Sequence, residues 1–350
     1  MTAVITSVPA DTLAWLTEED NPAVAVMTRR LLLGEPDSPE LDELWSKRND
    51  YAPVKKILDA VQEDGSWGPS ASDYQKYKQG SLWQIHFLGE LYASGDSDRV
   101  QRAANYVFSR QRPDGSWSIN GRADGAIPCL TANVGRALAR LGWARDERVI
   151  DALAYNVRIY RELGLGCRGV VGYNLNGYCH MLAPKTLLFL AEVPRDLWPD
   201  GAEDLRDACI AALRERSVFR YLPAGVKEFQ EQLMAVPPKE RAAFRERYVE
   251  EHGLDYGPKP GWLRFGYPLS YNSDALEALV SLMAIGEPMR EEYAEALAVV
   301  RDAADPQMRW TMKNSFNGKM LADVEVKGQP SKWLTLRALL VLKHFGIEAA

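Results

Sequence analysis

Histidine and cysteine are scarce in this sequence of 350 residues, which contains four of each. Four cysteines are too few for a disulfide scaffold in a chain of this length. Four dispersed histidines (His86, His180, His252 and His344) also argue against a histidine-rich metal centre. We therefore expect no bound metal and no disulfide framework.

Long apolar runs and excess positive charge are missing as well. No apolar stretch approaches the roughly 20 residues of a membrane span, so we expect no integral membrane segment. The start of the chain lacks the basic and apolar parts of a signal peptide, which predicts a cytoplasmic protein with reduced cysteines. The net charge of −6 gives no attraction to nucleic acid.

Common cofactor motifs are absent, and we expect no cofactor. The sequence has no P-loop, no His-Glu-x-x-His and no Gly-x-Ser-x-Gly elbow. GLGCRG at 164–169 matches a dinucleotide-binding pattern, but a predicted helix precedes it where that pattern needs a strand. We interpret it as a degenerate copy of the turn described next.

An internal repeat is the first positive feature. VQEDGSW ends at Trp67 and RQRPDGSW ends at Trp117, which lies 50 residues later. Asp-Gly is a turn signal, and the following tryptophan can pack beneath the turn. The glutamine that precedes each turn can cap backbone groups of a neighbouring helix. These residues indicate the fold and not the chemistry.

The rest of the sequence has helical periodicity almost throughout. Segments that are apolar nearly all round alternate with segments that carry one apolar stripe, which predicts buried inner helices and half-exposed outer helices. The predicted inner helices are 81–95, 129–142, 179–193, 270–286 and 331–346. The predicted outer helices are 40–62, 97–111, 146–163, 202–216 and 289–304, with a further pair near 11–17 and 21–34.

Six such hairpins predict an all-α fold, an (α/α)6 toroid that forms a single domain over residues 1–350. One helical insertion, 217–269, interrupts the repeat, and Pro237-Pro238 divides its charged part into two helices. The insertion is interpreted either as a lid over the mouth of the ring or as an outward elaboration or dimer contact. We expect a monomer or a homodimer.

The turn motif resembles that of the squalene cyclase and protein prenyltransferase repeat superfamily. The whole chain is similar to bacterial single-ring proteins of that superfamily, through both DGSW turns, 262–279 and 330–342. The resemblance implies a ring with a hydrophobic central cavity. The Asp-x-Asp-Asp acid of the cyclases and the Asp-Asp-x-x-Asp cluster of metal-dependent terpene synthases are both absent. The single Asp-x-Cys, at Asp207 and Cys209, falls within a predicted outer helix and is a poor zinc candidate.

Chemistry is expected where the inner helices begin, because their N-termini point into one mouth of such a ring and favour negative charge. The candidate substrate-binding residues are polar or aromatic side chains at or just before these starts. They are Tyr74, Tyr77, Trp83, His86, Cys129, Cys167, Arg168, Tyr173, Tyr178, Tyr271, Asn272 and Trp333. For Trp83 and Trp333, simple core packing is the favoured interpretation.

Asp274 is the first candidate catalytic residue, because burial in an apolar helix would raise its pKa towards neutrality. The alternative is a capping aspartate at the start of that helix. His180 is the expected proton-transfer partner, with hydrogen bonding to a loop carbonyl as the alternative. Cys179 beside it is the candidate nucleophile, or else a small core residue.

These residues predict an acid–base enzyme that needs no metal. It would be an isomerase, cyclase, hydratase or lyase acting on an apolar or aromatic small molecule, such as an isoprenoid, in the central cavity. An Asp274→Asn variant is then expected to be inactive. One alternative is a glycoside-active (α/α)6 enzyme, with Asp274 and either Asp124 or Asp73 as its carboxylates. The other is a non-catalytic carrier of isoprenoids or lipids.

Overall fold

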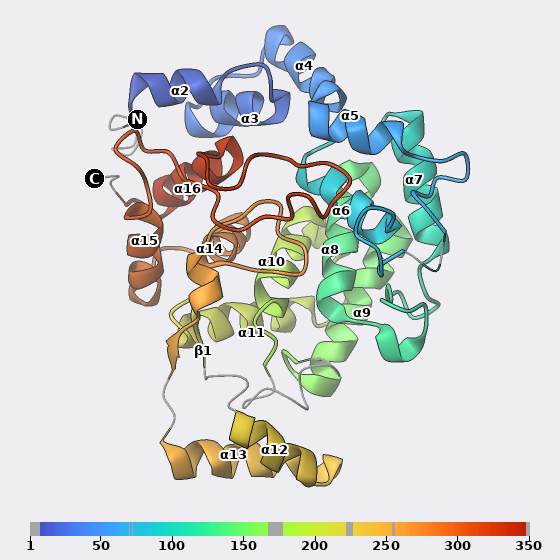
Figure 1. Ribbon diagram of the computed structural model, residues 1–350, viewed down its shortest axis with the longest axis vertical. Coiled ribbons are helices and arrows are strands. Elements are labelled where there is room, and N and C mark those ends of the chain that lie inside the picture. Colours follow the sequence, from blue (N-terminus) through green and yellow to red (C-terminus); the bar gives the residue numbers. More distant parts are fainter. Residues whose placement is uncertain are drawn as a thin grey trace.

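The protein is helical, as a computed structural model shows (Figure 1). The structure describes residues 8–69, 71, 73–166, 178–221, 227–253 and 256–347. Within these residues the named strands are β1 (Arg220–Tyr221) and β2 (Gly257–Pro258), which form one short antiparallel pair. The predicted all-α class is confirmed.

In the part of the chain that the structure describes, five buried helices form the interior. In α6 and α8 every residue is buried, which explains why their sequences are apolar on all sides. Each of the five packs against the next one in chain order. These inner helices are α6 (Ser81–Glu90), α8 (Pro128–Leu138), α10 (Leu182–Glu192), α14 (Ala275–Ala284) and α16 (Lys332–Phe345).

A second set of helices covers the inner helices and buries one face of each outer helix. In α7 the buried residues Val100, Ala103, Ala104 and Val107 follow the three- and four-residue spacing of one helical stripe. Each outer helix contacts the inner helix that precedes or follows it. They are α5 (Ala52–Asp59), α7 (Asp98–Ser109), α9 (Glu147–Leu163), α11 (Ala202–Glu215) and α15 (Ala294–Arg301).

The first two N-terminal helices lie beside the last helix of the chain, and the third packs against the second. They are α2 (Ala10–Leu16), α3 (Pro22–Met27) and α4 (Pro39–Ser46), and the π-helical turn η1 (Thr28–Leu32) follows α3. Both α3 and η1 pack against α16, so the two ends of the chain are neighbours (Figure 1). The predicted continuous helix over 40–62 is instead broken at Tyr51, because Pro53 fits the first turn of a helix but not its interior.

Short 3₁₀ and π turns connect these helices. They are η2 (Lys47–Asp50), η4 (Ala123–Gly125), η5 (Ala139–Trp143), η6 (Arg195–Leu197), η7 (Pro238–Glu240), η8 (Pro260–Leu263) and η9 (Glu291–Tyr293).

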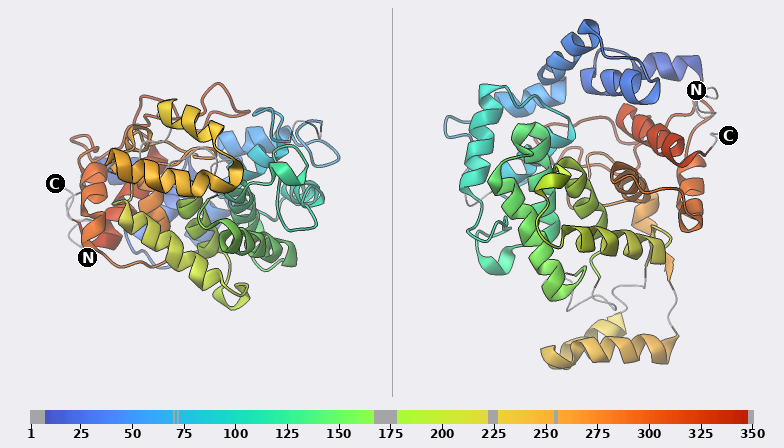
Figure 2. Two further views of the ribbon diagram at one scale, coloured as in Figure 1. Left: turned by 90° about the horizontal axis from the view of Figure 1, so that it is seen from below. Right: turned by 180° about the vertical axis from the view of Figure 1, so that it is seen from behind.

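The insertion folds into a helical pair, α12 (Lys227–Ala235) and α13 (Arg241–His252), which divides at Pro237-Pro238 as predicted. Phe229, Leu233 and Tyr248 give this pair a small apolar core of its own. In Figures 1 and 2 the pair stands apart from the inner helices at one end of the molecule, beyond the β1–β2 ribbon. Its roles as a lid or a dimer contact remain predictions.

The two DGSW turns are built alike and anchor outer helices to inner helices. The indole nitrogens of Trp67 and Trp117 donate to the carbonyls of Ile57 and Val107, each ten residues earlier, at 2.8 and 2.9 Å. Their backbone N–H groups approach the hydroxyls of Ser81 and Thr131, each 14 residues later, at 3.4 and 3.2 Å. The glutamines differ, because the Gln111 amide alone reaches across to a neighbouring helix, at the Arg148 carbonyl (2.7 Å).

Trp310 forms a third anchor of the same kind, although no DGSW sequence precedes it. Its indole donates to the carbonyl of Val300, again ten residues earlier, at 2.7 Å. Its backbone N–H donates to the hydroxyl of Thr335, 25 residues later, at 3.0 Å. Met308 occupies the left-handed conformation (φ 57°) that Gly65 and Gly115 adopt in the other two turns. The backbone of the turn is thus repeated although its glycine is not.

Replacing Gly115 with alanine is expected to lower the free energy of unfolding by more than about 2 kcal/mol. The residue has φ 86°, and an added Cβ would lie 2.3 Å from the carbonyl oxygen of Asp151. Gly121 has a similar φ of 74° with open space around it, so Gly121→Ala is the matched control and should lose only about 1 kcal/mol. Urea unfolding of both variants measures the difference, and equal losses would refute the role of the close contact.

Candidate functional site

A loop of the chain, residues 264–274, crosses the interior and is fixed there by side chains of the inner helices. The Lys185 ammonium donates to the Leu269 carbonyl at 3.2 Å, and His86 Nε2 lies 3.3 Å from the same oxygen. The Asn133 side chain donates to the Ser270 carbonyl at 2.9 Å, and the Tyr267 hydroxyl donates to the backbone of α6. We call this segment the central loop.

Buried charges on the inner helices surround the central loop. Lys185 on α10 and Glu277 on α14 form an ion pair (Nζ to Oε1 2.9 Å) in which both residues are at most 2% exposed. Glu90 on α6 pairs with Arg136 on α8. Burial opposes the ionisation of Glu90, but the neighbouring arginines outweigh it and lower the pKa of this carboxyl to about 2. The interior is therefore ionic as well as apolar.

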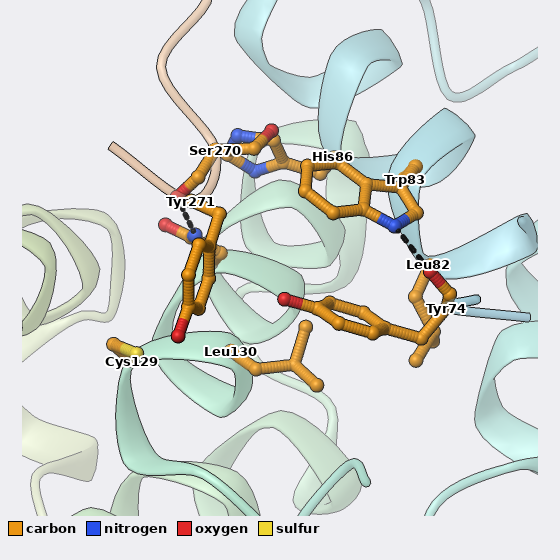
Figure 3. Close-up of a pocket in the computed structure, with 9 residues that line it drawn as sticks. Tyr74, Leu82, Trp83, His86, Cys129, Leu130, Ser270 and Tyr271 are labelled. Carbon is orange, nitrogen blue, oxygen red and sulfur yellow. Dashed lines mark hydrogen bonds between the residues drawn. The ribbon is translucent and has the colours of Figure 1, made fainter. Parts of the chain in front are cut away.

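An aromatic cavity opens where α6 and α8 meet the central loop (Figure 3). The space that water can enter has a volume of about 20 Å³, which holds one water molecule. Five of the predicted site residues meet here. The cavity is lined by Tyr74, Leu82, Trp83, His86, Cys129, Leu130, Asn133, Ser270 and Tyr271.

The walls of the aromatic cavity are two tyrosines and a tryptophan. The Trp83 indole donates to the Tyr74 carbonyl at 2.8 Å and stacks on the Tyr74 ring with centroids 5.2 Å apart. In Figure 3 the Tyr74 hydroxyl points into the space between the rings, and the Tyr271 hydroxyl lies towards Cys129. Tyr271 is 51% exposed, so its ring closes the cavity from the solvent side.

His86 is the titratable base of this cavity. A carbonyl only accepts hydrogen bonds, so the Nε2 atom facing Leu269 carries the hydrogen and Nδ1 is left as the acceptor. Nδ1 is buried and makes no hydrogen bond with the described residues, and the same holds for the Ser270 hydroxyl. Burial lowers the pKa of His86 to about 4, although Glu90 opposes the shift. The imidazole is therefore neutral at pH 7.

A second cavity, of about 300 Å³, is bordered by the next two residues of the central loop, Asn272 and Ser273. It contains three more predicted residues, Cys179, His180 and Asn272. Burial and the nearby Lys259 and Arg216 lower the pKa of His180 to about 3, so this imidazole is also neutral. We call it the Lys259 cavity. Its lining is Cys179, His180, Met181, Lys259, Gly261, Trp262, Asn272, Ser273 and Asn314.

Asp274 occupies the N-cap of α14. Its carboxylate accepts the backbone N–H groups of Glu277 (2.7 Å) and Gly266 (2.9 Å), which fixes both the helix start and the central loop. Burial raises the pKa of Asp274 to about 7, against the effect of these two donors. The residue is 1% exposed and lines neither cavity, so the structure shows the capping arrangement. Its catalytic role remains a prediction.

The other predicted residues have varied positions. Tyr77 packs edge-on against Trp83 at the rim of the aromatic cavity, with ring centroids 4.7 Å apart. Tyr178 lies under the Arg216 guanidinium, 4.1 Å from its ring, and beside His180. Trp333 stacks on Tyr267 in the core, at 4.9 Å. Cys167, Arg168 and Tyr173 lie outside the described residues.

Carboxylates and metal ligands do not gather at either cavity in the part of the chain that the structure describes. No group of three or more His, Cys, Asp or Glu residues there has the arrangement of a metal site. Asp207 pairs with Arg206 at the surface, whereas Cys209 is fully buried. Asp73 pairs with Arg110, and exposed Asp124 pairs with Arg122.

Sequence reasoning missed the charged residues of the inner helices and much of the second cavity. Lys185, Glu277 and Glu90 are isolated charges within apolar helices, and this pattern is itself a signal of a central ionic network. Lys259 and Trp262 gave no such signal, because they lie within the predicted insertion, 217–269, and belong to no repeat. The positions of Lys259 and Trp262 are set by the β1–β2 ribbon that precedes them.

Comparisons with known proteins identify no family. No protein-family model matches the sequence, and no curated protein matches it. A crystal structure described as a protein from Actinoplanes is similar to 87% of this chain and 99% of its own, with 15% identity and a TM-score of 0.35. No helix in the described residues is long and apolar enough to cross a membrane.

Proposed function

We propose that the protein is an enzyme that binds an apolar or aromatic small molecule at the aromatic cavity and moves a proton on it with its own side chains. The observation that carries this proposal is the state of His86, a neutral imidazole whose tautomer is held by the Leu269 carbonyl and whose Nδ1 has no partner among the described residues. Isomerases, cyclases, hydratases and lyases all require such a proton transfer.

Isomerisation of a carbonyl compound fits the residues best. With a β,γ-unsaturated carbonyl compound, His86 Nδ1 would take a proton from the carbon between the carbonyl and the double bond. It would return the proton to the γ carbon of the resulting dienolate, so that the double bond moves into conjugation with the carbonyl. The Tyr74 hydroxyl would donate a hydrogen bond to the enolate oxygen. Burial raises the pKa of Tyr74, so this phenol stays protonated and keeps its donor. A donor aimed at developing negative charge is a strong catalytic device in a dry site.

Substrate entry requires a movement of the cavity wall, because the closed cavity has space for one water molecule only. Tyr271 is the side chain placed for this movement. It is half exposed and belongs to the central loop instead of a helix. Rotation of its ring towards solvent would open the cavity over Trp83 and Cys129.

We also propose that the helices form an (α/α)6 ring and that the protein belongs to the superfamily that its sequence resembles. The helix contacts support a closed ring, since they run from α6 through α8, α10, α14 and α16 to α3 and return through α4, the turn η2 and α5 to α6. We further propose that the protein is cytoplasmic and that it is a monomer or a homodimer.

Exchange of substrate hydrogen with solvent deuterium tests the proposed function. The purified protein is incubated with a small-molecule cell extract in D₂O, and mass spectrometry identifies compounds that gain deuterium. We expect His86→Gln to lower the rate of that exchange by about 10² to 10⁴. Glutamine can still donate to Leu269, so the central loop keeps its contact. His344→Gln is the control, because His344 lies at the end of α16 against the Glu287 carbonyl.

The outcomes separate the alternatives. Undiminished exchange in His86→Gln would refute His86 as the base. Loss of exchange in Asp274→Asn, with an intact fold, would instead return the catalytic role to Asp274. A compound that is retained by the protein but gains no deuterium and no mass change would indicate a carrier.

A further inference from the structure

The Lys259 cavity has an unusual combination of donors. Lys259 follows β2, and its backbone N–H extends the ribbon by donating to the Phe219 carbonyl at 3.0 Å. The turn η8 begins directly after it, and Trp262 N–H donates back to the Lys259 carbonyl at 2.9 Å. The lysine is therefore held by backbone hydrogen bonds on both sides and is not part of a loose surface loop.

The Lys259 ammonium has no carboxylate partner among the residues that the structure describes. It lies 4.3 Å from the centre of the Tyr221 ring, a cation–π contact that leaves its N–H donors available. Burial lowers the pKa of Lys259, and Cys179 opposes that shift. A half-buried ammonium without a carboxylate partner keeps its donors for an anion beside it, and a charge-assisted hydrogen bond there would be a strong one.

A second polar group of the lining is also unsatisfied. Ser273 is 5% exposed, and its hydroxyl makes no hydrogen bond with the described residues. Asn272 and Asn314 add side-chain amides, whereas the lining contains no aspartate or glutamate. Because His180 is neutral, Lys259 supplies the single positive charge of this lining. One cation with several neutral donors matches a carboxylate better than a multiply charged phosphate group.

The two cavities share a wall. Ser270 and Tyr271 line the aromatic cavity, and the next two residues of the central loop, Asn272 and Ser273, line the Lys259 cavity. On the helix side, Cys129 of the first cavity and Cys179 of the second belong to one apolar cluster. The rotation of Tyr271 that would admit a substrate therefore takes place beside the Lys259 cavity.

We infer that the Lys259 cavity is a carboxylate-binding subsite, and that the ligand of the aromatic cavity is an apolar or aromatic carboxylic acid. The anion site stands on its own residues, whereas its assignment to the substrate rests on the proposed function. A volume of about 300 Å³ is at the lower end of the range for small-molecule sites and suits a carboxylate with a short linker.

Calorimetric titration with cinnamate, and with its uncharged amide as the matched ligand, tests the inference. We expect cinnamate to bind the wild-type protein more tightly than cinnamamide. Lys259→Met should weaken cinnamate binding at least about tenfold, because a hydrogen bond to a charged group is lost. Ser273→Ala should weaken it about two- to tenfold. Lys239→Met, an exposed lysine of the insertion, is the control and should bind as the wild type does.

Thermal melting confirms that each variant is folded before it is titrated. Equal binding of the amide, unchanged cinnamate binding in both Lys259→Met and Ser273→Ala, or displacement of cinnamate by an equal concentration of inorganic phosphate would overturn the inference. If cinnamate binds through Lys259 but no deuterium exchange depends on His86, the subsite stands and the proposed enzyme fails. If deuterium exchange depends on His86 but cinnamate binding does not depend on Lys259, the proposed enzyme stands and the carboxylate subsite fails.

Discussion

Replacing Lys185 with methionine is expected to lower the free energy of unfolding by about 3–5 kcal/mol. The ammonium group lies 2.9 and 3.1 Å from the two carboxylate oxygens of Glu277, and both residues are almost fully buried. Methionine fills a similar volume but leaves the Glu277 carboxylate without a counter-ion in the interior. The cost is therefore mainly that of an uncompensated buried charge.

A double-mutant cycle isolates this cost. Lys185→Met with Glu277→Met removes both charges, and we expect the double variant to recover stability to within about 1 kcal/mol of the wild type. Lys55→Met is the control, because Lys55 forms an exposed pair with Asp59 that should contribute less than about 1 kcal/mol. Urea unfolding measures five proteins: the wild type, the single variants Lys185→Met and Glu277→Met, the double variant and Lys55→Met. A double variant as unstable as Lys185→Met would show that Lys185 acts mainly through its bond to the Leu269 carbonyl.

The Asp274→Asn variant is expected to lose a pH dependence of folding that the wild type has between about pH 4 and pH 7. The pKa of Asp274 rises from 3.8 to about 7 on folding, so the folded protein retains a proton that the unfolded chain releases. Its contribution to stability is therefore present below about pH 4 and lost as the pH rises through about 7. A shift of this size corresponds to roughly 4 kcal/mol at most.

The measurement is the free energy of unfolding of both proteins from pH 3 to pH 8. Glu325, with a pKa raised to about 7, contributes with the same sign, and Glu90, with a pKa of about 2, contributes with the opposite sign at lower pH. Glu325 and Glu90 are present in the wild type and in the variant. The difference between the two curves therefore gives the contribution of Asp274 to the free energy of unfolding. Asparagine keeps one capping oxygen and loses the acceptor for Gly266 N–H, which lowers stability at every pH. Parallel curves would refute the raised pKa.

Local patterns made the helices and two of the three tryptophan turns predictable. Helical periodicity depends on which face of each segment is buried, and this information lies in adjacent residues. The third turn was missed because Met308 holds the left-handed position where the motif has glycine. The tertiary contacts of Trp310 are retained, although the local sequence signal is gone.

The candidate site was predictable only in part, for a related reason. The starts of α6 and α8 supplied Tyr74, Trp83, His86 and Cys129, because position along a helix is a local property. The central loop was not foreseen, since its path depends on long-range hydrogen bonds from Asn133 and Lys185. That loop brings Ser270 and Tyr271 to the first cavity and separates it from the second.

The three tryptophan anchors define where this protein can be remodelled. Each anchor joins an outer helix to an inner helix through a carbonyl at a fixed distance of ten residues, while the hydroxyl on the inner helix follows after 14 residues in two cases and 25 in the third. Eleven additional residues are thus accommodated without altering the joint. The segment between tryptophan and hydroxyl is therefore the part of the joint whose length varies, and a loop of new sequence grafted there would change the rim of the cavities. The graft would have to keep the backbone contacts of this segment, such as that of Asn314 N–H with the Phe265 carbonyl.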